Sequence, residues 1–220
     1  MSRLARLGFA VELAREGDER DEALARVRKE ADRMTALVGE LLQLTRIEGD
    51  PTAGKWGNVA LHHLLDDIVN DCDLEAEARG CRLVLRSVQP AVISGERELL
   101  HRAVENIVRN AIRHTPEGTT VEIALELRGD MAVTSVRDHG PGVPEALLSD
   151  IFKPFFRVED DRSRASGGVG LGLAIARRAV EVHQGKIAAN NARPGLVITI
   201  SLPHARAPIK VPSVETFLPA

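Results

Sequence analysis

The sequence predicts an α+β fold in which an antiparallel helical hairpin precedes an α/β sandwich. Its first 50 residues show only the three- and four-residue hydrophobic steps of amphipathic helices. From residue 58 onward, short alternating runs typical of strands are mixed with helical runs, without strict β-α alternation. We therefore expect a mixed sheet of five or more strands with about three helices over 58–203, after a linker at 51–57 that contains glycine and proline.

The N-terminal hairpin is expected to consist of helices over 2–16 and 19–48. Gly17 breaks the first helix, and Asp18 can cap the second. A hairpin of two helices covers only part of its apolar stripe, and a second copy of the chain would complete a four-helix bundle. We therefore favour a homodimer formed through residues 1–50. The alternative is that the hairpin packs against its own second domain.

In the second domain, the apolar periodicity indicates each element in turn. Helices are predicted over 61–79, 96–114, 144–150 and 171–183, and strands over 81–88, 91–94, 120–127, 131–137, 186–190 and 195–202. The two strands that flank Arg128-Gly129-Asp130 form an antiparallel pair. Residues 158–168 are polar and end in glycine, which predicts a mobile loop, and residues 204–220, with three prolines, are interpreted as a tail.

Composition excludes several classes of function. A net charge of −3 and an aromatic content of 3%, with no Tyr, do not favour nucleic-acid binding. Cys72 and Cys81 fit no metal or redox spacing, so we expect two reduced structural thiols. The sequence has neither a signal peptide nor an apolar run approaching the roughly 20 residues of a membrane span. Any membrane anchor of the parent protein would then lie outside this chain.

The densest glycine cluster lies directly before the helix expected at 171–183. Gly167, Gly168, Gly170 and Gly172 let the backbone approach a ligand closely. The N–H groups that open the following helix attract anions, so the segment is typical of a phosphate site. The alternative is an ordinary glycine-rich linker before a helix.

A second polar feature lies on the helix expected at 96–114. Asn106, Asn110 and Arg113 recur at four- and three-residue steps, so they share one face with His114 beside them. The amide oxygen of Asn110 suits Mg²⁺ that carries substrate phosphates, and Arg113 can neutralise phosphate charge. The alternative is a solvated helix face.

A carboxylate follows the strand expected at 131–137. Asp138 can accept a hydrogen bond from the exocyclic amine of adenine, whereas guanine presents a carbonyl oxygen at that place. Gly140 and Gly142 would let the backbone pass beside the base. Thr199, on the last strand, is a candidate to reach Asp138 through water. The alternative for this segment is a plain turn.

Three of the chain's five phenylalanines cluster just before the loop at 158–168. We expect Phe152 and Phe155 to form a small core that pins a lid, with Lys153 and Arg157 near a triphosphate. Residues 145–168 would form that lid and close over the phosphates. Lys153 is equally consistent with a solvated surface lysine.

Taken in order, these segments resemble the N, G1, F and G2 boxes of sensor histidine kinases of two-component systems, which share the GHKL ATP-binding fold. The resemblance covers roughly residues 2–203. It implies that ATP and Mg²⁺ bind here, with Mg²⁺ held by Asn110 and with Asn106 as a second candidate ligand. The positions implied to bind ATP are Asn106, Asn110, Arg113, His114, Asp138, Gly140, Gly142, Lys153, Phe156, Arg157, Gly168, Val169, Gly170, Leu171, Gly172, Leu173 and Thr199. The family usually has a hydroxyl-bearing aromatic at position 156, so a phenol hydrogen bond is absent.

The resemblance also implies an activity and partners. Such kinases transfer the ATP γ-phosphate to a histidine and then to an aspartate of a response regulator receiver domain. Residues 1–7 resemble the end of the acceptor-histidine motif, with Ser2 and Leu4 at matching positions and Arg3 in place of proline. The acceptor would then lie before Met1, so this chain is not expected to phosphorylate its usual site. We expect a cytoplasmic domain of an inner-membrane sensor.

Two other functions remain open from the sequence. Related ATPases of the gyrase and chaperone type place a glutamate base four residues before the Mg²⁺-binding asparagine. Asn106 occupies that position, and Glu105 is turned about 100° around the helix. A degenerate pocket that serves as a protein-interaction module is the other alternative. An anti-sigma serine kinase fits poorly because it lacks the helical hairpin.

Overall fold

The computed structural model describes Leu24 and residues 56–158 and 170–204. Apart from Leu24, the expected helical hairpin lies outside the described residues, as do most of the linker, the greater part of the loop at 158–168 and nearly all of the tail. The expectations for those segments therefore stay predictions. None of the helices in the described part of the chain is long and apolar enough to cross a membrane.

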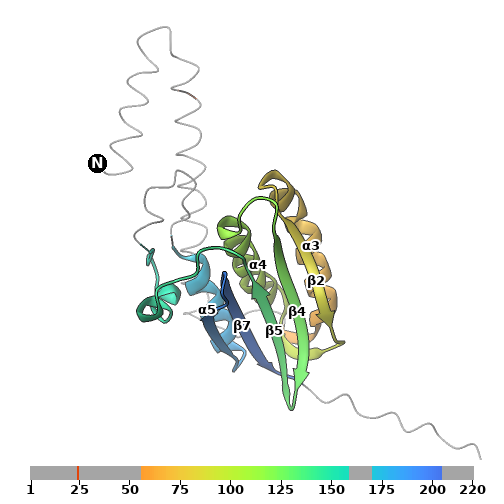
Figure 1. Ribbon diagram of the computed structural model, residues 1–220. Coiled ribbons are helices and arrows are strands. Elements are labelled where there is room, and N and C mark those ends of the chain that lie inside the picture. The colour runs from red at the N-terminus through yellow and green to blue at the C-terminus, as the bar shows by residue number, and fades with distance from the viewer. Residues whose placement is uncertain (1–23, 25–55, 159–169, 205–220) are drawn as a thin grey trace, which may run out of the picture.

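A mixed five-stranded sheet forms the centre of the domain (Figure 1). Its strands are β2 (Arg82–Val88), β4 (Thr120–Arg128), β5 (Met131–Arg137), β6 (Lys186–Asn191) and β7 (Leu196–Pro203). Their order is β2-β4-β5-β7-β6, in which β2 and β4 are parallel and the other pairs are antiparallel. The predicted α+β class and mixed sheet are confirmed.

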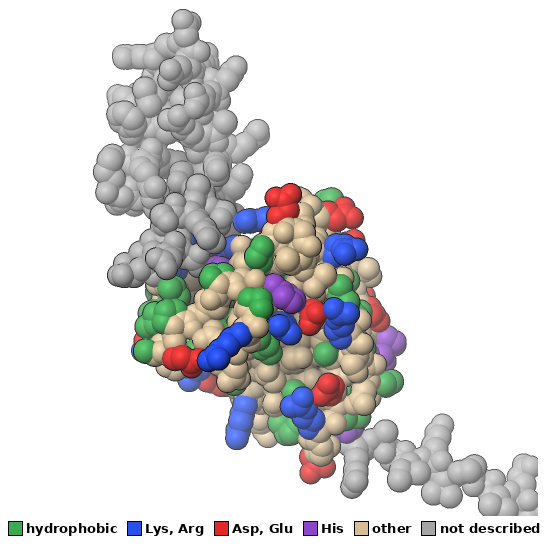
Figure 2. Space-filling model, in the orientation of Figure 1, with side chains coloured by type: hydrophobic (Ala, Val, Ile, Leu, Met, Phe, Trp, Pro, Cys, Tyr) green, Lys and Arg blue, Asp and Glu red, His purple; other side chains and the backbone are tan. Residues whose placement is uncertain are grey.

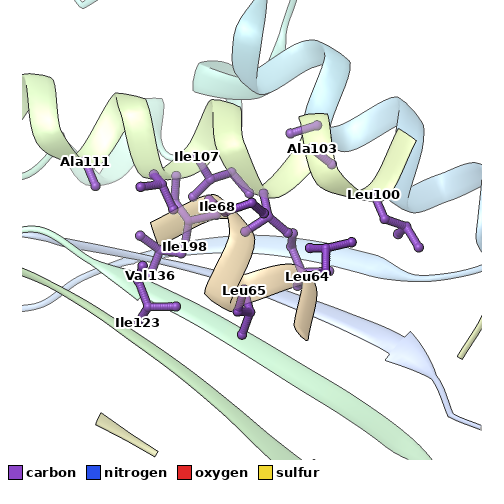
Figure 3. Packing of buried hydrophobic residues seen from close by; sticks show 14 of the residues in the cluster. Leu64, Leu65, Ile68, Leu100, Ala103, Ile107, Ala111, Ile123, Val136 and Ile198 are labelled. Carbon is purple, nitrogen blue, oxygen red and sulfur yellow. The ribbon is translucent and has the colours of Figure 1, made fainter. Parts of the chain in front are cut away.

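Over residues 56–158 and 170–204, three α-helices cover one face of this sheet: α3 (Leu61–Ala78), α4 (Arg97–His114) and α5 (Gly172–Val182). Their buried side chains follow the apolar periodicity, as Leu100, Ala103, Ile107 and Ala111 do on α4. Figure 3 shows these side chains meeting those of α3 and of the sheet. The polar face of α4 is left to point away from the core, which is where its asparagines lie.

A second, two-stranded sheet was not predicted. Strand β1 (Trp56–Ala60) pairs antiparallel with β3 (Val92–Glu96). The Trp56 ring stacks on the His183 ring with centroids 4.7 Å apart, and its Nε1 donates a hydrogen bond to Ser94 Oγ at 2.9 Å. The strand therefore begins before the linker boundary expected at residue 57. So short a segment gives little alternation in the sequence, and only its pairing with β3 defines it.

The short helix expected at 144–150 is instead two 3₁₀ turns, η1 (Glu145–Leu147) and η2 (Asp150–Phe152). Each closes with an i→i+3 hydrogen bond, from Leu147 N to Pro144 O at 2.8 Å and from Lys153 N to Asp150 O at 2.9 Å. This chain segment forms one wall of the cavity described next.

The surface charge is mixed in sign. Figure 2 shows acidic and basic side chains interspersed over the coloured part of the face in view, with no broad region of one sign there. This distribution agrees with the net charge of −3.

Candidate functional site

A cavity of about 1010 Å³ lies between α4, the start of α5 and the loops that follow β5 and β6. Its volume is at the upper end of the range of small-molecule and cofactor sites. The cavity brings together many of the predicted site residues from segments far apart in the sequence. These are Asn106, Asn110, Arg113, His114, Asp138, Gly142, Phe156, Arg157, Gly170, Gly172 and Leu173.

The polar face of α4 forms one wall. Asn106, Asn110 and Arg113 all line the cavity, as their spacing predicted. The start of α5 packs closely against this wall, because a Cβ placed on Gly172 would lie 3.3 Å from Asn106 Oδ1. With a side chain at that position, the asparagine amide or α5 would have to shift by a few tenths of an ångström. The glycine therefore keeps the entry of α5 beside the amide groups.

Arg109 lines the same wall and was not predicted. Its guanidinium pairs with Glu105 at 3.0 Å and with Glu75 of α3 at 3.5 Å. The spacing of 106, 109, 110 and 113 on one helix face could have identified it. Because two carboxylates already neutralise its charge, Arg109 is a weaker anchor for an anionic ligand than its position suggests.

Asp138 follows the end of β5 and is only 4% exposed. Its Oδ1 accepts hydrogen bonds from Gly140 N at 2.8 Å and from Leu196 N at 3.1 Å. Because both donors point at Oδ1, Oδ2 is the oxygen left to serve a ligand in the cavity. Burial raises the pKa of this carboxyl group, although the two backbone hydrogen bonds oppose the shift. The geometry suits recognition of a ligand amine.

Two glycines allow the loops around Asp138 to come together. A Cβ on Gly140 would lie 2.6 Å from the backbone oxygen of His114, and one on Gly195 would lie 1.8 Å from that of Asp138. Gly195 also has a φ of +99°, which L side chains rarely adopt. Gly140 therefore supports the site from behind without lining the cavity.

Gly170, a member of the glycine cluster, contacts the described part of the lid expected at 145–168. Gly170 has a φ of +82°, and its carbonyl oxygen accepts a hydrogen bond from Phe155 N at 2.9 Å. Phe152 is buried as predicted, but Phe155 is 61% exposed, so the prediction that it joins a small core is wrong. Phe155 itself takes a φ of +63° where it makes this hydrogen bond, and its ring is left outside the core.

Several predicted site residues do not line the cavity. Lys153 is an exposed side chain paired with Asp150 at 2.7 Å, and Leu171 is fully buried against Ile175. Thr199 pairs with Ser135 on the sheet face opposite Ile198 and Ile200, which point into the core. The expected water link from Thr199 to Asp138 is therefore incorrect. Gly168 and Val169 lie outside the described residues.

The turn between β6 and β7 completes the cavity, and the sequence did not reveal its part in the site. Asn191, Arg193, Pro194, Gly195 and Leu196 all line the cavity. No chemical motif marks this turn. The one available signal was Pro194-Gly195 between two strands, which is typical of an ordinary hairpin turn.

The available donor groups determine how the cavity could hold Mg²⁺. Within 56–158 and 170–204, no group of three or more His, Cys, Asp or Glu side chains is placed to hold a metal ion. A cation in this cavity would rely on amide oxygens, such as that of Asn110, and on the phosphates of its ligand. Mg²⁺ commonly enters nucleotide sites in this way, with few protein ligands of its own.

Comparison with known proteins places the chain in a family. The family model described as "Histidine kinase-, DNA gyrase B-, and HSP90-like ATPase" matches residues 95–206, about half of the chain. The chain belongs to this family, whose ATP-binding domain has the fold described above. The relatives named below are sensor histidine kinases, and among solved structures the fold is that of their catalytic domain.

The probable sensor histidine kinase TcrY of Mycobacterium tuberculosis is 36% identical over 200 residues, which cover 89% of this chain and 42% of TcrY. The mycobacterial sensor histidine kinase MprB, a solved structure, is 27% identical with a TM-score of 0.60 and covers 69% of this chain and 99% of that one. A histidine kinase, ThkA, solved in complex with the response regulator TrrA, has the same fold at 19% identity, with a TM-score of 0.76 over 93% of this chain and 58% of that one. The chain spans less than half of the curated relatives it matches.

Proposed function

We propose that this chain is the ATP-binding catalytic part of a sensor histidine kinase, which delivers the γ-phosphate of ATP to a histidine. The observation that carries the proposal is the joint placement of Asp138, the asparagine face of α4 and the glycine entry of α5 around one cavity. Membership of the ATPase family and likeness to TcrY support it.

The roles follow from position. Asp138 Oδ2 would accept the adenine amine, and the wall of Asn106, Asn110 and Arg113 would face the triphosphate with its Mg²⁺. Arg157 lines the cavity from within the lid expected at 145–168, so the phosphates would lie between two arginines. Phosphoryl transfer of this kind depends on positioning and charge neutralisation. The nucleophile in this reaction is the acceptor histidine, so the described residues need not supply one.

An ATPase of the related hydrolytic type is the second candidate, and the described residues give little support for it. Asn106 occupies the position where such enzymes need a base, and Glu105 pairs with Arg109 at 3.0 Å. That ion pair engages the Glu105 carboxylate with Arg109 rather than with a water molecule. We therefore favour transfer to a protein histidine over hydrolysis.

The proposed partners are a second copy of the chain, which would dimerise through residues 1–50, and a response regulator receiver domain. The complex of ThkA with its response regulator supports the second partner by analogy. We further propose that the chain acts at the cytoplasmic side of an inner-membrane sensor, with the acceptor histidine supplied from outside residues 1–220.

The first test is titration calorimetry with Mg²⁺–ATP, with phosphate release measured in the same samples. We expect saturable binding without sustained turnover. A helical hairpin that bears an acceptor histidine, added in trans, should become labelled from ATP carrying a labelled γ-phosphate. Sustained phosphate release without the hairpin would instead support a hydrolase. Absence of binding would mean that the cavity is degenerate and that the proposal is wrong.

A further inference from the structure

Asn191, the last residue of β6, makes an unusual set of hydrogen bonds at the rim of the cavity. Its Oδ1 accepts a hydrogen bond from Val143 N at 2.9 Å, and its Nδ2 donates to Val143 O at 2.7 Å. One primary amide thus pairs with both backbone groups of a single residue, as a neighbouring strand would. Nδ2 also donates to Glu145 Oε1, which lies 3.3 Å away.

These contacts connect two segments that line the cavity. Val143 lies in the loop that follows Asp138, and Asn191 opens the β6–β7 turn that carries Gly195. Leu196, just beyond that turn, donates its N–H to Asp138 Oδ1. The Asn191 amide therefore joins the loop after the carboxylate to the turn that orients the carboxylate.

The backbone around Val143 is shaped to receive this amide. Gly142 has a φ of +74°, and a Cβ there would lie 2.7 Å from Asn191 Oδ1. A side chain at position 142 would displace the amide. Pro144 follows and offers no N–H, so Val143 N is the backbone donor that the amide captures at this point of the loop.

We propose that Asn191 is a positioning residue for nucleotide binding, which holds the Gly142–Pro144 loop against the β6–β7 turn and so fixes the end of the cavity beside Asp138. The inference rests on the proposed nucleotide function. Without the amide, the loop would have to be ordered when the ligand binds, and affinity would fall by that cost. Glu145 makes the position selective for an amide, because a carboxylate at 191 would face the carboxylate of Glu145 and would lose the donor to Val143 O.

The test uses N191A and N191D in the whole chain, with N190D as the matched control. Asn190 is the exposed neighbour on the same strand and does not line the cavity, so N190D adds the same charge without touching Val143. We expect N191A to weaken Mg²⁺–ATP binding by about tenfold, the equivalent of one or two hydrogen bonds. N191D should weaken it further at neutral pH, whereas N190D should stay within about twofold of the wild type.

A pH profile separates positioning from a merely structural role. Protonation of the new carboxyl group restores a donor, so the affinity of N191D relative to the wild type should improve as the pH falls from about 7.5 to about 5.5. Adding E145Q to N191D should also recover affinity, by more than E145Q changes the wild type. A constant ratio of affinities across pH, with no recovery in the double variant, would overturn the inference.

Hydrogen exchange without nucleotide gives an independent readout. The Val143 amide should be protected in the wild type and in N190D, and should exchange faster in N191A at unchanged global stability. If the wild type binds no nucleotide, the proposed function fails and this inference fails with it. If the wild type binds but N191A binds equally well and Val143 stays protected, the inference alone is wrong.

Discussion

Replacing Asp138 with asparagine should separate ligand recognition from stability. Oδ1 of Asp138 accepts the N–H groups of Gly140 and Leu196, at 2.8 and 3.1 Å. An asparagine would keep its oxygen on these two donors, so its NH₂ group would take the place of Oδ2 and face the cavity. A donor would then meet the adenine amine. Loss of a hydrogen bond to a charged group costs about 1.5–3 kcal/mol, which is roughly a 10- to 150-fold loss of affinity for ATP.

The free energy of unfolding of D138N should not fall in the way that its affinity for ATP does. Burial raises the pKa of Asp138, so the folded state favours the protonated form. For an acid whose folded pKa lies above its unfolded pKa, the stabilising contribution is present at low pH and is lost as the pH rises through the folded pKa. At neutral pH the wild type therefore carries a burial cost that a neutral asparagine lacks. We expect the free energy of unfolding of D138N to be unchanged or higher.

The assay pairs calorimetric titration of ATP and GTP with denaturant unfolding at neutral pH. D138N should lose affinity for ATP and gain relative affinity for GTP, because the NH₂ group can donate to the guanine carbonyl oxygen. Unchanged ATP affinity would refute the assignment of Oδ2 to the adenine amine. A loss of more than about 2 kcal/mol of stability would show that the charge itself is needed to hold the two loops.

Other contacts give predictions for His183, Gly195 and Asn110. Burial lowers the pKa of His183, whose Nε2 accepts a hydrogen bond from Glu96 N at 2.9 Å. A base whose folded pKa is depressed contributes stability above its unfolded pKa, and this stability is lost as the pH falls toward the folded value. Unfolding by denaturant should therefore become easier below about pH 6.5, and H183Q should show a flatter pH dependence in the same titrations. G195A should abolish nucleotide binding or folding, since its Cβ would lie 1.8 Å from Asp138 O. G129A should lose only about 1 kcal/mol of stability in thermal unfolding, because Gly129 has a φ of +61° and a Cβ there would have no atom within 4 Å. Similar losses of stability for G195A and G129A would contradict this reasoning. N110A should weaken Mg²⁺–ATP binding about tenfold while changing Mg²⁺-free ATP binding little, and equal losses in the two calorimetric titrations would argue against a role at the metal.

Most of the secondary structure could be predicted from the sequence, because the buried faces of the helices and strands repeat with the right period. The apolar positions of α4 recur at three- and four-residue steps, and its asparagines point to another side. The hairpin of β4 and β5 was equally clear from alternation around Gly129. Strand β1 was missed because its pairing with β3 and the stacking of Trp56 on His183 define it, and neither contact is local in sequence.

The residues of the candidate site likewise include some that could be predicted from the sequence and some that could not. Asp138, Gly170 and Gly172 were predicted because a carboxylate at a strand end and glycines at a helix entry are chemically unusual. The prediction for Phe155 failed because a hydrogen bond to Gly170 O, rather than hydrophobicity, sets its backbone. Thr199 failed because a strand has two faces, and only the register with Ser135 shows which face this residue occupies.

Most of the helices and strands, their order, and many of the chemical groups that could meet a nucleotide were therefore predictable from the linear sequence. These properties depend on local periodicity and on residue type, which a chain displays directly. The closure of the cavity by Asn191, Arg193 and Gly195, and the capture of both backbone groups of Val143 by the Asn191 amide, emerged only from the folded chain. Hydrogen bonds between residues 48 positions apart leave no local pattern, because their geometry exists only once the sheet has paired and brought the two loops together.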